Sequence, residues 1–281
     1  MQFVNARFLK ILVDIAADLA LAPACLRCRV APMGSHDLCT AGLCSDCVAS
    51  LELLDPLGAQ CCRCGRPNPV SYQNATCPEC VRRPPAFRSA RSAARYGGTV
   101  RELLFAYKFR RDKILSVTLV DLLYHAAVRP GRRFDAVVPV PSHRARERLR
   151  KFAPVYSLGH ELSEKMNAAF RPQWLDRVRA GAPQGASTTM SRRQNVAGAF
   201  ATTGRRAFFA PRSPLGQSIL IVDDVFTSGS TARECAAALR TAGARNVEVA
   251  TIARGGLGRS SYLSNTSSNI NHLPEFLNIT I

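Results

Sequence analysis

The fold of this chain is indicated most clearly by the stretch Ile219-Leu-Ile-Val-Asp-Asp-Val-Phe-Thr-Ser-Gly-Ser-Thr231. Its apolar first half predicts a buried strand, and the adjacent carboxylates Asp223 and Asp224 stand at the carboxyl end of that strand. Ligands bind at this end of the strands in open α/β sheets. The stretch therefore predicts a parallel α/β sheet with a ligand site beside the two aspartates.

The second half of the stretch has the composition of a phosphate-binding loop. Small hydroxyl residues surround a glycine and open a helix, in the order Thr227, Ser228, Gly229, Ser230, Thr231. Backbone N–H groups and the helix dipole favour a phosphate there, while the carboxylates face sugar hydroxyls or a magnesium ion. A diol beside a phosphate describes a ribose 5-phosphate. The alternative is an acidic strand end followed by an ordinary helix cap, which does not explain the paired aspartates.

Outward from this stretch, predicted strands alternate with predicted helices. Helices are expected at 100–108, 114–128, 155–169 and 231–242, and further strands at 134–140 and 247–252. This alternation is typical of a parallel sheet flanked by helices.

The cysteines form a separate pattern near the N-terminus. Ten of the eleven lie between Cys25 and Cys80, and Cys235 stands alone in a helical pattern. Eight of them form four C-x-x-C pairs: Cys25 and Cys28, Cys44 and Cys47, Cys61 and Cys64, Cys77 and Cys80. The gaps of 15 residues (29–43) and 12 residues (65–76) suit zinc ribbons, so two structural zinc ions are expected.

Sequential pairing of the C-x-x-C units is the simplest arrangement, and crossed pairing and iron–sulfur ligation stay open as alternatives. Cys39 and Cys62 are left over and are interpreted as small thiols without a ligand role. A segment this small and rich in Gly, Pro and Arg needs the metal for its stability.

Residues 1–24 are predicted to form an amphipathic helix and not a signal peptide. Asp14 and Asp18 interrupt the apolar run, and Ile11, Ile15 and Leu19 recur at helical spacing. No apolar stretch reaches the length of a membrane span. A reducing cytoplasm is therefore expected, where clustered cysteines bind metal more often than they form disulfides.

The charge of the chain is strongly positive. Lys and Arg number 38 against 20 Asp and Glu, which gives a formal net charge of +18, and only five of the cations are lysines. Arginine matches phosphate oxygens in a bidentate way, although solvated surface arginines explain the excess equally well. The run His143–Lys151 holds five cations in nine residues, and it is either a solvated face or a trap for pyrophosphate or nucleic acid. No obvious set of exposed aromatics accompanies it, which weakens the case for nucleic acid.

Several motifs together resemble a known family. The segment 222–231 is similar to the signature of type I phosphoribosyltransferases that bind 5-phosphoribosyl 1-pyrophosphate, and with a double zinc ribbon it resembles the ComF family, bacterial proteins associated with competence for DNA uptake. The segment 107–112 is similar to the family's Lys-Phe segment. Gln184, Arg192-x-x-Asn195 and Gly198-Ala-Phe200 resemble its C-terminal motifs.

The resemblance implies roles for these residues. Asp223 and Asp224 would hold the ribose hydroxyls and help organise magnesium, and 227–231 would bind the 5-phosphate. The segment after Pro141 would be the pyrophosphate loop, with Arg146 and Arg150 as catalytic candidates at the leaving group, and 177–193 would be a mobile flap. The loop departs from the family's Arg-Gly-Phe-Asn-Gln, because Lys151, Ala153 and Pro154 replace the glycine and both amides. This departure puts turnover in doubt.

The expected domains are an N-terminal helix (1–24), a double zinc ribbon (25–81), a linker (82–92), a phosphoribosyltransferase-like domain (93–254) and a flexible tail (255–281). The expected function is magnesium-dependent transfer of the phosphoribosyl group to an unidentified nitrogen acceptor. The alternative is a catalytically weak or inactive protein that binds single-stranded DNA or acts as a scaffold for competence proteins.

Overall fold

The computed structural model describes residues 25–29, 42–54, 59–67, 75–110, 113–141, 152–177, 200–202 and 213–257. The predicted N-terminal helix lies outside these residues, and so does the predicted tail after residue 257. Among the helices that are described, none is long and apolar enough to cross a membrane.

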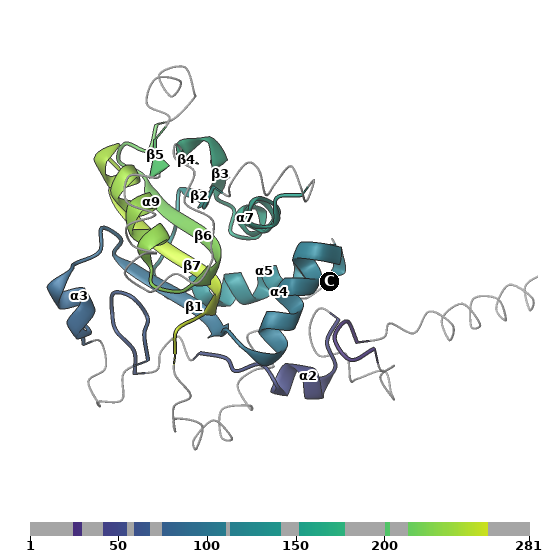
Figure 1. The fold of residues 1–281 in the computed structure, drawn as a ribbon. Helices are drawn as coiled ribbons and strands as arrows, with labels where there is room; N and C mark the ends of the chain where they lie inside the picture. Colours follow the sequence, from purple (N-terminus) through teal and green to yellow (C-terminus); the bar gives the residue numbers. More distant parts are fainter. Residues whose placement is uncertain are drawn as a thin grey trace, which may run out of the picture.

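The elements follow one another along the chain as labelled in Figure 1. In order they are α2 (Ser45–Ala49), α3 (Pro78–Arg82), β1 (Ser89–Arg95), α4 (Gly98–Arg110), α5 (Lys113–Ala127), β2 (Ala136–Pro139), α7 (Pro154–Lys165), β3 (Ala169–Phe170), η1 (Pro172–Trp174), β4 (Asp176–Arg177), β5 (Phe200–Ala201), β6 (Ser218–Phe226), α9 (Ser230–Thr241) and β7 (Asn246–Arg254). Each helix and strand expected from residue 100 onward is present, with ends that differ by a few residues.

Five strands form one parallel sheet in the order β1-β7-β6-β2-β3. The strands β4 and β5 form a separate antiparallel pair. The central strand β6 is buried from Ser218 to Val222, as expected of a strand with a layer on each side. The predicted α/β fold is confirmed.

Helices cover both faces of the sheet (Figure 1). The helices α4, α5 and α7 pack on one face, where Leu119, Leu123 and Leu158 are fully buried. The helix α9 covers the other face and buries Ala232, Cys235, Ala236 and Leu239, which lie one helical turn apart. The sheet is therefore the middle layer of three.

The strand β1 is the main difference from the sequence-based expectation. The predicted linker at 82–92 contains the first residues of this strand, which is buried from Ser89 to Ala94 and pairs with β7 from Ser89 to Arg95. The stretches that carry the first four and the last four C-x-x-C cysteines, called the first and second cysteine segments below, both bond to the other edge of β1. Leu54 N–H, after the first segment's cysteines, donates to Ala93 O over 2.8 Å, and Ala90 N–H donates to Arg63 O of the second segment over 2.7 Å. The cysteine segments therefore cover the edge of the sheet.

Candidate functional site

The topology of the sheet indicates where a ligand would bind. From β2 the chain crosses through α7 to β3 on one side, and from β6 it crosses through α9 to β7 on the other side. The two crossovers diverge between β2 and β6, which makes this the switch point where ligands bind outside the carboxyl ends of the strands. Asp223 and Asp224 lie at this end of β6, and Pro139 ends β2 beside them, opposite Val222.

The two aspartates form a small polar cluster with a lysine from α4. The Lys108 ammonium makes an ion pair with Asp224 Oδ2, and the backbone N–H of Asp224 donates to Asp223 Oδ1 over 2.9 Å. Burial raises the pKa of Asp223 to about 8, and the neighbouring Asp224 carboxylate adds to this effect. Lys108 counters only part of it, so the site is one that a further cation or hydroxyl donors would stabilise.

The loop Thr227–Thr231, called the phosphate loop below, turns sharply into α9. Gly229 has a φ of +74°, and a Cβ atom there would lie 2.5 Å from the Phe226 ring, so this position requires glycine. Ser228 Oγ and Ser230 Oγ share a hydrogen bond of 2.9 Å. The loop thus places two hydroxyls and a helix N-terminus close to the aspartates, which is an arrangement suited to a phosphate.

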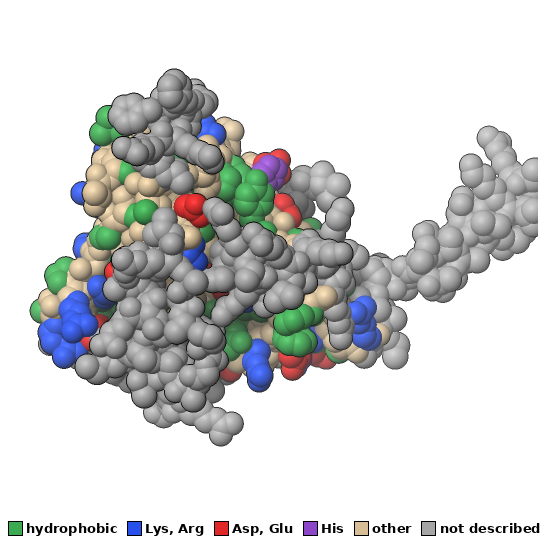
Figure 2. Space-filling view, turned by 45° about the horizontal axis from the view of Figure 1, so that its top comes forward, with side chains coloured by type: hydrophobic (Ala, Val, Ile, Leu, Met, Phe, Trp, Pro, Cys, Tyr) green, Lys and Arg blue, Asp and Glu red, His purple; other side chains and the backbone are tan. Residues whose placement is uncertain are grey.

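A cavity of about 150 Å³ opens against this loop. Ser228 and Ser230 line it from the loop, Arg233 and Glu234 from α9, and Glu79 and Arg83 from α3 and the residue that follows it. Figure 2 shows Lys and Arg side chains gathered at the end of the molecule that carries α3, where Arg82 and Arg83 are exposed. A cysteine segment therefore contributes side chains to the surroundings of the phosphate loop.

The eight C-x-x-C cysteines come together in two groups. Cys25, Cys28, Cys44 and Cys47 form the first cysteine group, and Cys61, Cys64, Cys77 and Cys80 form the second. Within each group the sulfur atoms all lie within 4.8 Å of one another. The structure thus groups the cysteines in the sequential pairing, and the crossed alternative is not observed.

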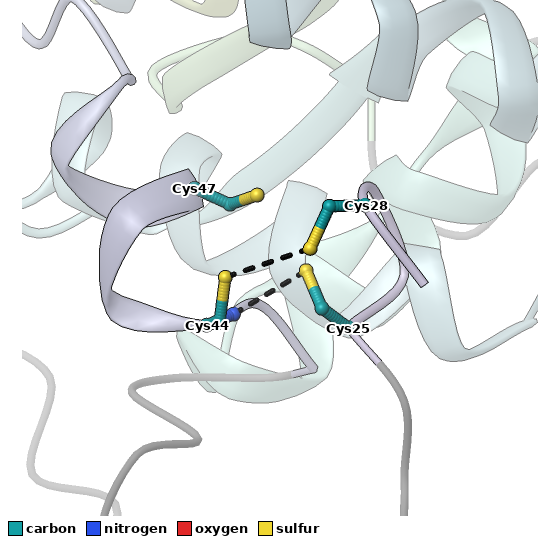
Figure 3. Close-up of side chains that lie close together, drawn as sticks. All are labelled: Cys25, Cys28, Cys44 and Cys47. Carbon is teal, nitrogen blue, oxygen red and sulfur yellow. Dashed lines mark hydrogen bonds between the residues drawn. The ribbon is translucent and has the colours of Figure 1, made fainter. Parts of the chain in front are cut away.

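The sulfur distances fit a shared tetrahedral ion. Cys28 Sγ and Cys44 Sγ are 3.8 Å apart, and so are Cys64 Sγ and Cys77 Sγ (Figure 3 for the first pair). Four sulfurs at about 2.3 Å from a zinc ion lie about 3.8 Å from one another, whereas a disulfide bond measures about 2.05 Å. Both groups could therefore hold zinc.

Backbone N–H groups point at the sulfur atoms, as zinc-binding turns require. Cys44 N–H donates to Cys25 Sγ over 3.4 Å, as Figure 3 shows, and Cys77 N–H donates to Cys61 Sγ over 3.2 Å. A side-chain bond from Cys64 and three such backbone bonds lower the pKa of Cys61 to about 4. Burial would raise the pKa of Cys25, but backbone bonds from Cys44 and Cys28 lower it to about 6. Each group thus contains a sulfur that is readily ionised for metal binding.

The two groups lie on opposite faces of the sheet. The first packs with the core of α4, α5 and α7 through Cys25 and Cys47, and the second packs with Phe87 and the core beneath α9. Of the leftover thiols, Cys62 is half-buried and shares a 3.1 Å hydrogen bond with Thr76 Oγ1. Cys235 is buried in the core, and burial raises its pKa well above the usual value.

Some predicted site residues lie outside the described part of the chain. They are Arg146, Arg150 and Lys151 of the predicted pyrophosphate loop, Gln184, Arg192 and Asn195 of the predicted flap, and Cys39. Ala153 and Pro154 are described, and Pro154 opens α7 with Ala153 as its N-cap.

Sequence reasoning missed three basic residues around the site. Lys108 was noted only within a family-like segment, and its contact with Asp224 was not expected. Arg233 and Arg254 were not singled out, although both contact the second cysteine group. Arg254 directly follows the apolar run of the last predicted strand. That position was the only sequence feature that pointed to a role for this arginine near the site.

Comparison with known proteins adds a family match and several relatives. Residues 175–267 match the model of the phosphoribosyl transferase domain. Competence protein F of Haemophilus influenzae is 27% identical over 236 residues, covering 82% of this chain and 96% of that protein. DNA utilization protein YhgH of Salmonella typhimurium is 29% identical over 230 residues, covering 80% of this chain and 94% of that protein.

A solved structure also aligns with part of the chain. It is described as the structure of the allosteric regulatory enzyme of purine biosynthesis, with a TM-score of 0.31 and 21% identity over 49% of this chain and 26% of that chain. The matched domain covers the phosphate loop, and the relatives span most of the sequence. The domain match and these two relatives together confirm the resemblance that the motifs predict: the chain is similar to both relatives over most of its length, and it matches the phosphoribosyl transferase domain over residues 175–267.

Proposed function

We propose that this chain binds 5-phosphoribosyl 1-pyrophosphate with magnesium in the crevice between β2 and β6. One observation carries the proposal: Asp223 and Asp224 emerge at the switch point of the sheet directly beside the phosphate loop. In this arrangement the carboxylates accept hydrogen bonds from the ribose hydroxyls, and the loop binds the 5-phosphate through its N–H groups and hydroxyls. Catalysis would transfer the phosphoribosyl group to an acceptor and release pyrophosphate.

The residues at the site fit a magnesium ion, because carboxylate and phosphate oxygens are its preferred ligands. Magnesium bound with the substrate would neutralise charge on the departing pyrophosphate. Lys108 of α4 holds Asp224 in place through its ion pair, and it adds a positive charge beside the two aspartates. Arg146 and Arg150 are proposed to face the leaving group.

Calorimetry with 5-phosphoribosyl 1-pyrophosphate, with and without magnesium, tests the binding proposal. Asp223→Asn combined with Asp224→Asn should keep the fold and weaken magnesium-dependent binding, by about 1.5–3 kcal/mol for each charge-assisted contact that is lost. A double variant that binds as tightly as the parent, with the same magnesium dependence, would refute the ribose-site assignment. An assay for pyrophosphate release with candidate bases then separates binding from turnover.

We propose structural roles for two zinc ions, one in each cysteine group. The sulfur distances and the N–H···S bonds support this assignment. We also infer a cytoplasmic location, since thiolate sites of this kind persist where the surroundings are reducing.

A second candidate function is binding of single-stranded DNA, in keeping with the names of the relatives. The sequence shows no obvious set of exposed aromatics beside the basic run, but the surface of α4 carries an exposed pair. Phe105 and Phe109 are 63% and 57% exposed there, and their ring centroids lie 4.4 Å apart. Exposed aromatic rings on a basic protein can stack with bases.

The basic run and the aromatic pair give this second candidate a direct test. Replacing Arg146, Arg148 and Arg150 with alanine should lower the affinity for single-stranded DNA and make it less dependent on salt, because fewer counterions are released. Phe105→Ala with Phe109→Ala should lower the affinity by about 1–3 kcal/mol per stacked base, with little change in the salt dependence. Unchanged affinity in both variants would leave the DNA-binding hypothesis without support from these residues.

A further inference from the structure

Two arginines connect the second cysteine group to the phosphate loop. Arg254 ends β7 and is only 3% exposed. Its guanidinium donates to the Cys64 carbonyl, lies 3.7 Å from Cys64 Sγ through Nη2, and stacks 4.4 Å from the centre of the Phe226 ring. Phe226 in turn packs beneath Gly229, at the centre of the loop. A shift of Cys64 therefore reaches Gly229 through two packed side chains.

Arg233 makes the second connection, from the first turn of α9. Its Nη1 donates to Arg83 O over 2.6 Å, and its Nη2 lies 3.8 Å from Cys80 Sγ. The backbone N–H of Arg233 donates to Gly229 O over 2.9 Å, so the same residue also closes the first turn after the loop. Arg233 and Ser230 line the same cavity as Arg83.

Both arginines contact sulfur atoms that a bound metal ion would hold in place. A zinc ion with four thiolates carries a net charge of −2, which two guanidinium groups offset. Within the described ranges, no carboxylate forms an ion pair with Arg254, so the sulfur cluster is its anionic partner there. Without metal, nothing would bond the four sulfur atoms to one another, so the positions of Cys64 and Cys80, which Arg254 and Arg233 contact, would no longer be fixed.

We propose that Arg233 and Arg254 are positioning residues through which metal loading of the second cysteine group sets the affinity of the phosphate loop for a phosphate ester. This inference rests on the proposed function of the loop. Among the described residues, the arginine of the first cysteine group, Arg27, contacts Cys47 Sγ over 3.8 Å and Glu102 of α4 over 2.9 Å, and it makes no contact with the phosphate loop. The two metal groups would thus differ in their effect on phosphate binding.

Thermodynamic reciprocity provides the first test, with ribose 5-phosphate as the probe. If metal strengthens phosphate binding, the phosphate must strengthen metal binding by the same factor. Competition with a chromogenic chelator should show that ribose 5-phosphate raises the affinity of one of the two zinc ions by about fivefold or more. Arg254→Met and, separately, Arg233→Met should remove this increase, while Arg27→Met serves as the matched control and should keep it. An equal increase in the parent and in both variants would overturn the proposal.

Hydrogen exchange provides a test that needs no ligand. Removing metal from the parent should speed the exchange of the backbone N–H groups at 228–233, and in Arg254→Met these groups should exchange rapidly whether or not metal is bound. If the parent fails to bind ribose 5-phosphate but its loop exchange depends on metal, the proposed function fails and the coupling stands. If the parent binds the sugar phosphate while neither its zinc affinity nor its loop exchange responds, the coupling is refuted and the binding site stands.

Discussion

At the scale of single residues, the candidate site holds more negative charge than the neighbouring side chains neutralise. Asp223 and Asp224 are neighbours in sequence, and only Lys108 among the residues described here makes an ion pair with either of them. The raised pKa of Asp223 expresses this imbalance. Such an arrangement lowers stability in the free protein and favours a ligand that brings magnesium or hydroxyl groups.

The first prediction concerns the pH dependence of stability in Asp223→Asn. The pKa of Asp223 is about 8 in the folded chain, above its ordinary value of 3.8, so ionisation opposes folding as the pH rises from about 4 to 8. Asparagine cannot ionise, so the variant should match the parent near pH 4 and become more stable by about 1 kcal/mol or more at pH 8, or about 2–4 °C in Tm. Thermal unfolding at several pH values measures this difference.

Asp46→Asn supplies the control for that prediction, because Asp46 is exposed on α2, away from the crevice. It should show no gain that grows between pH 4 and pH 8. A gain in Asp223→Asn that is as large at pH 4 as at pH 8 would contradict the assignment of a raised pKa.

At the scale of elements, the edge strand β1 depends on close approach by the second cysteine segment. Gly65 has a φ of +66°, and a Cβ atom there would lie 2.5 Å from Ala90 O on β1. The neighbouring contact between Ala90 N–H and Arg63 O fixes the same turn against the strand. A side chain at position 65 would push the cysteine turn off the sheet.

We therefore predict that Gly65→Ala destabilises the protein and loosens metal in the second cysteine group. The unfavourable φ costs about 1–3 kcal/mol by itself, and the contact with Ala90 O adds to it. Gly131→Ala is the matched control, since Gly131 has a φ of +72° but nothing within 4 Å of the added Cβ. Denaturant unfolding and zinc release would compare the two; equal losses in both would mean that the close approach is unimportant.

These elements also show what the sequence could and could not predict. The strand β6, the phosphate loop and α9 were predictable because one contiguous stretch contains the apolar run, both aspartates and the helix start. The strand β1 was missed, since Ser89-Ala-Arg-Ser-Ala-Ala-Arg95 lacks the β-branched and aromatic residues typical of strands. The small side chains of its Ser and Ala residues suit a strand that pairs with β7 on one edge and closely contacts both cysteine segments on the other.

Local sequence patterns could not predict the contacts of Arg233 and Arg254. Arg233 reaches Arg83 across 150 positions of sequence, and Arg254 reaches Cys64 across 190. Only the folded sheet brings these residues together. The two cysteine groups were predictable because the spacing of their cysteines is local, whereas their positions on opposite faces of the sheet depend on the whole fold.

At the scale of the whole molecule, the cysteine groups belong to the same cores as the sheet. Both groups include buried residues of the two clusters that fill its faces. We predict two zinc ions per chain by elemental analysis of protein purified without chelator. Removing them should lower the Tm by about 10 °C or more, because a structural zinc site supplies a large part of the local folding free energy.

The outcome that would contradict this prediction is specific. A metal content near zero, or the visible absorption of an iron–sulfur cluster, would exclude structural zinc. Chelation that removes zinc without changing the Tm would mean that the ions do not stabilise the cores they lie in.

The position of β1 has a consequence for how the chain emerges during its synthesis. Ser89 bonds to Glu248 on β7, a partner 159 positions later, so the ribosome needs roughly 10–30 s to supply the neighbouring strand. The cysteine segments precede β1 and are already available to pair with its other edge through Leu54 and Arg63. Zinc uptake by the nascent chain would thus shield one side of an unpaired strand before its permanent partner exists, which lowers the risk of aggregation on the ribosome.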